Sequence, residues 1–185
     1  SDFREYQQWC QEEKNKHQII VGFNFHPMLK KNQSMKEVQK ACFILADMII
    51  QLLNTHKNIS LLFIPHDNRG NLSDTIVLPI IAQKIKENGY TEAIKEIKKV
   101  YHADQIKAIA GLCDIMICSR MHLAIGALSS GVPIMAATYQ GKFHGLFKHY
   151  QLPEDLLLSP SDFTTPQFIS TFEKLYKNKK ELQKI

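Results

Sequence analysis

The stretch at residues 113–138 constrains the fold of this chain more than any other part of the sequence. It holds a short apolar run at 115–118, a polar tip, a helix-like run of small residues and a second apolar run at 134–137. A buried strand, a helix and another buried strand in this order are typical of the βαβ unit of a parallel sheet. Arg120 and His122 lie in the polar tip. They therefore fall at the carboxyl end of the first strand, where open parallel sheets bind their ligands.

The same alternation continues along the rest of the chain. Strands are predicted at residues 19–25, 60–65, 97–101, 115–118, 134–137 and 156–158. Helices are predicted at 34–56, 73–88, 103–112 and 123–130. A short helix is expected to follow the loop at 139–145 and to end at His149, and a last helix is capped by Ser161 or Thr165. Ser34 and Glu37 have the spacing of a capping box, and Pro79 lies inside the second helical pattern. The alternation predicts an α/β fold, a Rossmann-like, doubly wound and mainly parallel sheet of about six strands.

Length and composition set limits on the class of protein. The 185 residues suffice for one domain with a full core, predicted over 18–185, with 1–17 as a helix or linker. The net charge of +5 arises largely from lysine pairs and triplets, which indicate a solvated surface. Basic residues interleaved with aromatics are not found, so no nucleic-acid partner is predicted. No apolar run reaches the length of a transmembrane segment.

The four cysteines predict buried free thiols. They show neither CxxC spacing nor a histidine at zinc-binding spacing, so no metal site is predicted. Three of them, Cys42, Cys113 and Cys118, lie in apolar runs. Reduced thiols favour a reducing compartment, and we expect a cytoplasmic protein.

Arg120 and His122 are the strongest candidates for chemistry. Burial of a guanidinium costs several kcal/mol unless it is paired with an anion. Arg120 should therefore face either a carboxylate of its own fold or an anionic ligand. The amides that open the following helix would add to the affinity for an anion. The alternative is a structural Arg–Asp pair with a histidine that caps the helix. The spacing alone leaves both open.

Other polar residues follow other predicted strands. His66 and Asp67 end the strand at 60–65, although Asp67 could simply begin a turn. Asn24 and His26 end the first strand. Lys142, in a loop flanked by glycines, could reach a phosphate as a point charge. The chain has no G-x-G-x-x-G, Walker A or G-x-S-x-G motif, so nicotinamide, ATP-type and serine hydrolase sites lack their fingerprints.

The segment 113–145 resembles the polysaccharide pyruvyl transferase family. That family's pattern reads roughly as an acidic residue, an apolar run, R-[LM]-H, A-x-S-x-G-x-P, another apolar run and Y-x-x-K-x-x-G. The chain matches it at Asp114, Arg120, Met121, His122, Ala127, Ser129, Gly131, Pro133, Tyr139, Lys142 and Gly145. The tip at 64–67 also resembles the end of the family's second strand, and the whole resemblance spans about 19–152.

The resemblance implies the C-terminal half of a GT-B-like enzyme that moves pyruvyl from phosphoenolpyruvate to a sugar hydroxyl of a cell-surface or exopolysaccharide glycan. Arg120 would hold the anionic groups of the donor, and His122 would donate a proton or bind phosphate. The substrate contacts expected beside them are Ser119, Met121, His66, Lys142, Tyr139 and Asn24. The donor is a substrate, and no further cofactor is implied.

One departure from the family concerns its N-terminal half, which usually starts with a glycine-rich strand end followed by Gly-Asp. This chain has no such segment, so the resemblance implies that a separate N-terminal domain is its partner and that this domain alone is inactive. Two other functions stay open. One is a nucleotide-sugar-binding half of another GT-B glycosyltransferase or epimerase, with Arg120 on a diphosphate. The other is a non-catalytic binding module. The acceptor sugar and the oligomeric state, a homo-oligomer included, are also open.

Overall fold

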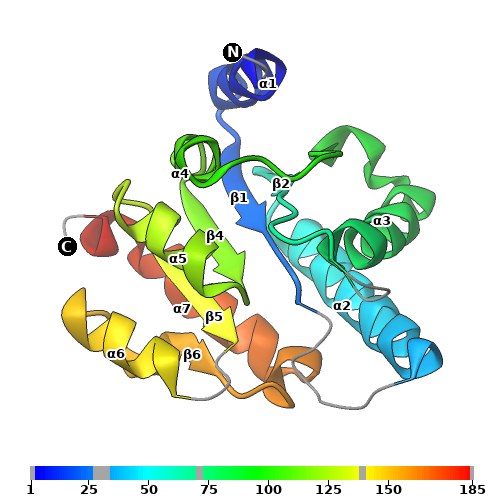
Figure 1. Ribbon diagram of the computed structural model, residues 1–185. Helices are drawn as coiled ribbons and strands as arrows, with labels where there is room; N and C mark the ends of the chain where they lie inside the picture. The colour runs from blue at the N-terminus through cyan, green and yellow to red at the C-terminus, as the bar shows by residue number, and fades with distance from the viewer. Residues whose placement is uncertain (1–2, 27–33, 70–72, 138–140, 184–185) are drawn as a thin grey trace.

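The structure is a computed structural model that describes residues 3–26, 34–69, 73–137 and 141–183. Six strands form one sheet in the order β3-β2-β1-β4-β5-β6, and every neighbouring pair is parallel (Figure 1). The strands are β1 (Ile19–Phe23), β2 (Ile59–Phe63), β3 (Ile94–Glu96), β4 (Ile115–Cys118), β5 (Ile134–Ala137) and β6 (Leu157–Leu158). The predicted α/β class and the six-stranded parallel sheet are thus confirmed.

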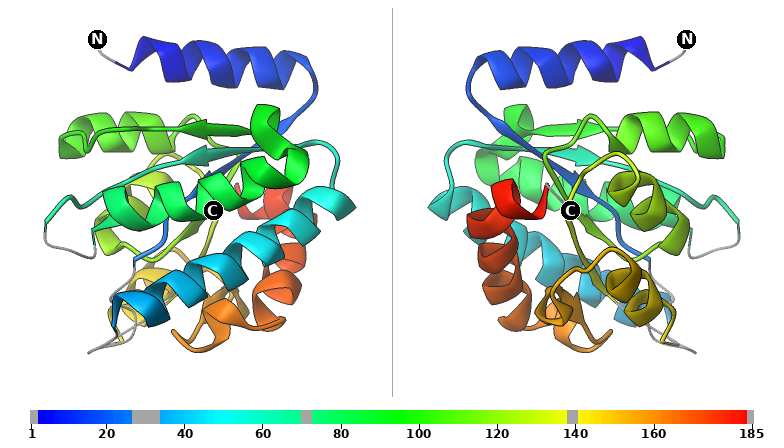
Figure 2. Two further views of the ribbon diagram at one scale, coloured as in Figure 1. Left: turned by 90° about the vertical axis from the view of Figure 1, so that its right-hand side faces the viewer. Right: turned by 90° about the vertical axis from the view of Figure 1, so that its left-hand side faces the viewer.

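Helices connect the strands and cover both faces of the sheet. They are α1 (Arg4–Asn15), α2 (Met35–Thr55), α3 (Asp74–Ile85), α4 (Ala103–Ala110), α5 (Met121–Leu128), α6 (Lys142–His149) and α7 (Gln167–Leu182). Short turns of helix lie at Lys86–Tyr90, Thr91–Ala93, Glu154–Leu156 and Asp162–Thr164. Helix α2 packs against α3 and α7, whereas α5 packs against α4 and α6. Helix α1 crosses the edge at which the strands begin (Figures 1 and 2).

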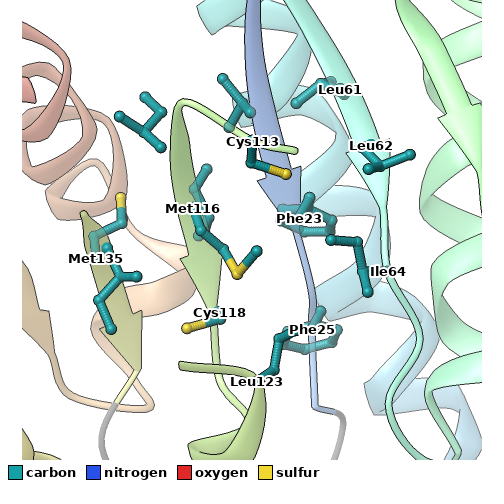
Figure 3. Close-up of a cluster of buried hydrophobic side chains, with 14 of the residues drawn as sticks. Phe23, Phe25, Leu61, Leu62, Ile64, Cys113, Met116, Cys118, Leu123 and Met135 are labelled. Atoms are coloured by element: carbon teal, nitrogen blue, oxygen red, sulfur yellow. The ribbon is translucent and has the colours of Figure 1, made fainter. Parts of the chain in front are cut away.

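The core lies on both sides of the central strands. Every residue of β2, β4 and β5 is buried, which is why these strands read as continuous apolar runs without alternation. Figure 3 shows side chains of these strands and of α5 filling the space around the sheet. Gly22 in β1 allows this close packing, since a Cβ there would lie 2.7 Å from Met116 Cε and 2.9 Å from Cys113 Sγ. All four cysteines are buried free thiols, as predicted, and burial raises the pKa of Cys10 to about 11.

Local sequence signals account for several boundaries. Ser34 and Glu37 form the predicted capping box, in which the Ser34 amide donates to Glu37 Oε2 at 2.7 Å and the Glu37 amide donates to Ser34 Oγ at 3.3 Å. Helix α3 continues through Pro79. Gly89 has a φ of 92°, in the left-handed region that glycine adopts at helix ends.

The third strand lies three residues earlier than predicted. The expected strand at 97–101 is wrong, because β3 covers Ile94–Glu96 and pairs with β2 only as far as Phe63. The Ile97 amide still donates to the Phe63 carbonyl at 3.0 Å, and Ile97 and Tyr101 are both buried. Both residues are apolar because they pack in the core. Their apolar pattern therefore resembles a strand, although the pairing with β2 has already ended.

No helix in the described part of the chain combines the length and the apolar character needed to cross a membrane.

Candidate functional site

Polar residues of three neighbouring strands meet at the carboxyl edge of the sheet. Asn24 follows β1, His66 follows β2 and Ser119 follows β4, and β1 lies between the other two strands. The chain order reverses between β1 and β4, which makes this point the topological switch of the sheet. Open α/β sheets bind ligands in the crevice at such a switch.

The Asp74 carboxylate is the centre of this group. It is fully buried at the start of α3. It accepts hydrogen bonds from Arg120 Nη2 at 2.6 Å and Arg120 Nε at 3.1 Å. It also accepts from Asn24 Nδ2 at 2.9 Å and from the His66 amide at 3.0 Å. One carboxylate therefore joins the ends of three strands to a helix, whose N-terminal dipole also favours the negative charge.

Arg120 is held by two carboxylates of its own fold. Besides Asp74, its Nη1 lies 3.3 Å from Asp67 Oδ2, and only 14% of its side chain is exposed. The expectation that this guanidinium is left for an anionic ligand is therefore corrected, and the Arg–Asp alternative describes what the structure contains. The reason is that an arginine this far buried needs a counter-charge within the fold.

Asp67 is itself fixed by a second arginine. Its Oδ1 accepts from the amide and from Nε of Arg69, both at 2.9 Å. These hydrogen bonds, with the nearby charge of Arg120, hold the pKa of Asp67 well below its usual range. Asp67 therefore stays ionised and continues the ion-pair network toward the surface, where Arg69 is exposed.

Two histidines lie beside the network. The rings of His66 and His122 are 6.0 Å apart between centroids and inclined by 57°. His122, the second residue of α5, is exposed, whereas His66 is half-buried. Burial lowers the pKa of His66, so its ring is neutral near neutral pH. Within the described residues, His66 Nδ1 is buried and has no hydrogen-bond partner. Two imidazoles therefore lie together at the carboxyl edge of the sheet.

The ends of β1 and β4 are also fixed by buried polar groups. Ser119 is fully buried, and its Oγ accepts from the His26 amide at 2.6 Å. Burial, reinforced by the charge of Arg120, lowers the pKa of His26 to about 4. Asn24 donates from Nδ2 to the Ile64 carbonyl at 2.9 Å, while its Oδ1 lacks a partner in the described part of the chain. A buried acceptor of this kind is available to a ligand or a water molecule.

Met121 and Lys142 do not join this group. Met121, the first residue of α5, is half-buried and packs on the core. Lys142 is exposed at the start of α6. Tyr139 lies outside the described residues. The structure thus brings together His66, Asn24, Ser119, Arg120 and His122, and it leaves Lys142 apart from their hydrogen-bond network.

Asp74 is the residue that the sequence reasoning missed. An acidic residue in the first turn of a helix usually serves the helix dipole at the surface. A signal was present, however, because Asp74 lies on the same face of α3 as the apolar residues at Val77, Leu78, Ile81 and Ile85. An acid in the buried stripe of a helix requires a partner in the core.

The described residues contain no group of three His, Cys, Asp or Glu side chains placed to hold a metal ion.

The fold and this network together define a Rossmann-like α/β domain with an ion-pair network at its switch point. The sequence profile of the family described as polysaccharide pyruvyl transferase matches residues 33–141, more than half of the chain. The chain belongs to this family. The matched segment contains His66, Asp67, Asp74, Arg120 and His122.

Nine chains of solved structures match the fold. One is the N-terminal domain of the Candida albicans trehalose-6-phosphate phosphatase, with a TM-score of 0.55 and 12% identity. The match covers all of this chain and 41% of that one, so this chain spans less than half the length of that protein. At this identity the similarity shows the fold alone. Comparison with curated proteins gives no match.

Proposed function

We propose that this chain is the donor-binding domain of a transferase that moves pyruvyl from phosphoenolpyruvate to a sugar hydroxyl. The observation that carries this proposal is the pair of neighbouring rings, His66 and His122, next to the Arg120–Asp74 ion pair and inside the segment that matches the family. The donor has a carboxylate and a phosphate, and it needs a proton on its methylene carbon as the sugar oxygen attacks. Two imidazoles beside this ion-pair network suit the need for a proton donor and for hydrogen bonds to the phosphate.

The reaction assigned to the site has two steps. One sugar hydroxyl adds to C2 of the enol, its oxygen forming a C–O bond while the methylene carbon gains a proton and becomes a methyl group. A second hydroxyl of the sugar then displaces phosphate from C2, loses its proton and closes the ketal. His122, which is exposed, would supply the proton or bind the phosphate. His66, neutral because its pKa is lowered, would accept the proton of the attacking hydroxyl.

Arg120 has a different role in this proposal from the one expected for a free guanidinium. Asp74 occupies Nη2 and Nε, so a donor carboxylate cannot bind Arg120 bidentately through these atoms without displacing Asp74. We assign Arg120 to fixing the tip between β4 and α5. Its Nη1 lies 3.3 Å from Asp67 Oδ2, so this side of the guanidinium is also paired within the fold.

The wider assignments follow from the family resemblance. The acceptor would be a glycan destined for the cell surface or an exopolysaccharide, and synthesis would take place in the cytoplasm. A second, N-terminal domain would complete the cleft. The domain described here would then bind donor weakly and turn over little by itself, because catalysis requires both reactants in one fixed geometry.

The test is phosphoenolpyruvate binding and turnover by the full-length protein that carries this chain. Titration calorimetry should show binding, and His122→Gln should lower kcat/KM for phosphoenolpyruvate by about 10²–10⁴-fold, the range typical of a lost acid–base group. His144→Gln is the matched control, since His144 is an exposed histidine on α6. A wild-type protein that does not bind phosphoenolpyruvate, or a His122→Gln variant as active as His144→Gln, would contradict the proposal.

A further inference from the structure

A pocket of about 260 Å³ lies at the carboxyl ends of β2 and β3 and against the first turns of α3, with Asp74 in its lining. We propose that this pocket binds one sugar ring of the glycan acceptor. The inference rests on the proposed function and adds to it the place and size of the acceptor subsite.

The first argument is position. Pro65 lines the pocket, and His66 is the next residue along the chain. Asp74 lines the same pocket and accepts the hydrogen bond of the His66 amide at 3.0 Å. The pocket therefore shares a wall with the proposed reaction site. A ring held there would lie at the same edge of the sheet as the Asp74 network.

The second argument is size. Pockets that enclose drug-sized ligands have volumes of about 300–1,000 Å³, and this pocket lies just below that range. It has room for a single ring, whereas a nucleotide with its attached sugar would exceed it. A larger hollow of about 740 Å³ lies between α2 and α3, lined by residues such as Phe43 and Lys84. None of the strand-end residues lines it, so it offers no route to the site.

The third argument is the chemistry of the lining. Leu78 and Ile97 supply apolar walls that can pack against the C–H faces of a sugar ring. Thr75 and Glu96 supply oxygen atoms that can hydrogen-bond hydroxyl groups. Glu96 is paired with Lys86, and its carboxylate has further lone pairs to accept from a ligand. Apolar walls with a few convergent polar groups are typical of small-molecule sites.

The test fills the pocket while leaving the histidine pair intact. In the full-length protein, Thr75→Trp would occupy the pocket from the first turn of α3. Ile76→Trp is the matched control, because Ile76 is the adjacent residue, is 38% exposed and does not line the pocket. The probes are the methyl glycosides of glucose, galactose, mannose and N-acetylglucosamine as acceptors, with phosphate release as the assay.

Thr75→Trp should raise the KM for the accepted glycoside about tenfold or more, and the Kd for phosphoenolpyruvate should change less than about twofold. Ile76→Trp should change neither. Thr75→Val keeps the side-chain volume and removes the hydroxyl, and it should also raise the acceptor KM. This second variant tests the proposal if Thr75→Trp fails to fold.

Two negative results can be told apart. Absence of phosphoenolpyruvate binding in the wild-type protein counts against the proposed function itself. Normal phosphoenolpyruvate binding with no glycoside accepted, or with acceptor KM unchanged in the Thr75 variants, overturns the pocket assignment alone. Equal loss of donor and acceptor affinity in Thr75→Trp also overturns it, because the pocket would then not be a separate subsite.

Discussion

A carboxylate is buried at the edge where the strands begin and another at the edge where they end, and the two differ in their surroundings. At the edge where the strands begin, Glu13 of α1 is 6% exposed and accepts from Ser60 Oγ at 2.6 Å and from Lys16 Nζ at 2.7 Å. At the edge where the strands end, Asp74 is fully buried and holds Arg120, of which 14% of the side chain is exposed.

The difference lies in what remains unsatisfied. Glu13 is hydrogen-bonded to Ser60 and to Lys16, and its hydrogen bond with Ser60 joins α1 to β2. The Asp74 group joins three strand ends and a second carboxylate, and beside it His66 Nδ1 and Asn24 Oδ1 are buried without partners in the described part of the chain. Polar atoms that are buried and unpaired reduce stability, so they tend to persist where a ligand uses them. The comparison separates a carboxylate whose neighbours are all paired from one that lies beside buried polar atoms without partners among the described residues.

The largest expected effect comes from breaking the Asp74 network. Asp74→Ala leaves the guanidinium of Arg120 without its main counter-charge in a site that is mostly buried, and removal of one partner of a buried pair costs about 3–5 kcal/mol. Urea denaturation measures this loss in the free energy of unfolding. Asp155→Ala is the control, because Asp155 forms an exposed pair with Lys174 that should contribute about 1 kcal/mol or less. Equal losses in the two variants would mean that Asp74 does not organise this edge.

A smaller effect is expected from pH. The pKa of His26 is lowered from 6.5 to about 4 in the folded protein, so the unfolded chain takes up this proton first as the pH falls. The unfolded state then binds more protons, and the stability held above pH 6.5 declines between about pH 6.5 and pH 4. At pH 5 the loss from this residue should be about 2 kcal/mol.

Urea denaturation at pH 7 and pH 5 checks this prediction. His26→Gln should reduce the difference in unfolding free energy between the two pH values, and His144→Gln should leave it as in the wild type. The groups that face His26 are Arg120, Asp74 and Asp67, of which the first lowers its pKa and the other two raise it. A wild-type protein equally stable at both pH values would show that His26 is not buried in neutral form.

The smallest effect concerns the edge at which the strands begin. Glu13→Gln keeps an oxygen that can accept from Ser60 but removes the charge that faces Lys16, and the expected cost is about 1–2 kcal/mol. Because this group is far from the histidine pair, donor affinity should not change. Titration with phosphoenolpyruvate and urea denaturation of the same sample give both values. A loss of both donor affinity and stability would contradict the prediction that Glu13 acts on stability alone.

Much of the fold followed from local patterns, and the exceptions have identifiable causes. The continuous apolar runs of β1, β2, β4 and β5 predicted buried parallel strands, and the capping box predicted the start of α2. The position of β3 was wrong because tertiary burial of Ile97 and Tyr101 imitates a strand. Ser73 stands at the predicted start of α3, but its hydroxyl pairs with Thr75 Oγ1 at 2.8 Å instead of capping the helix.

The site was predicted in part. That Arg120, His122 and His66 belong to one edge followed from their places after strands, since the carboxyl ends of parallel strands share an edge. The carboxylate that pairs with Arg120 could not be predicted from the sequence. Asp74 is 46 residues away along the chain, and no local pattern indicates the contact. The roles of these residues in donor binding stay predictions, as do those of Tyr139 and Lys142 and the division at residue 17.

The sequence by itself determined the class of fold, the edge of the sheet that carries the polar side chains and the resemblance to a family, because periodicity and strand-end position are properties of neighbours along the chain. Only the tertiary structure decided that Asp74 binds Arg120, that the rings of His66 and His122 lie 6.0 Å apart and that a pocket opens at the carboxyl ends of β2 and β3. These depend on which segments the sheet order brings together, and charges pair through space without regard to their separation in sequence.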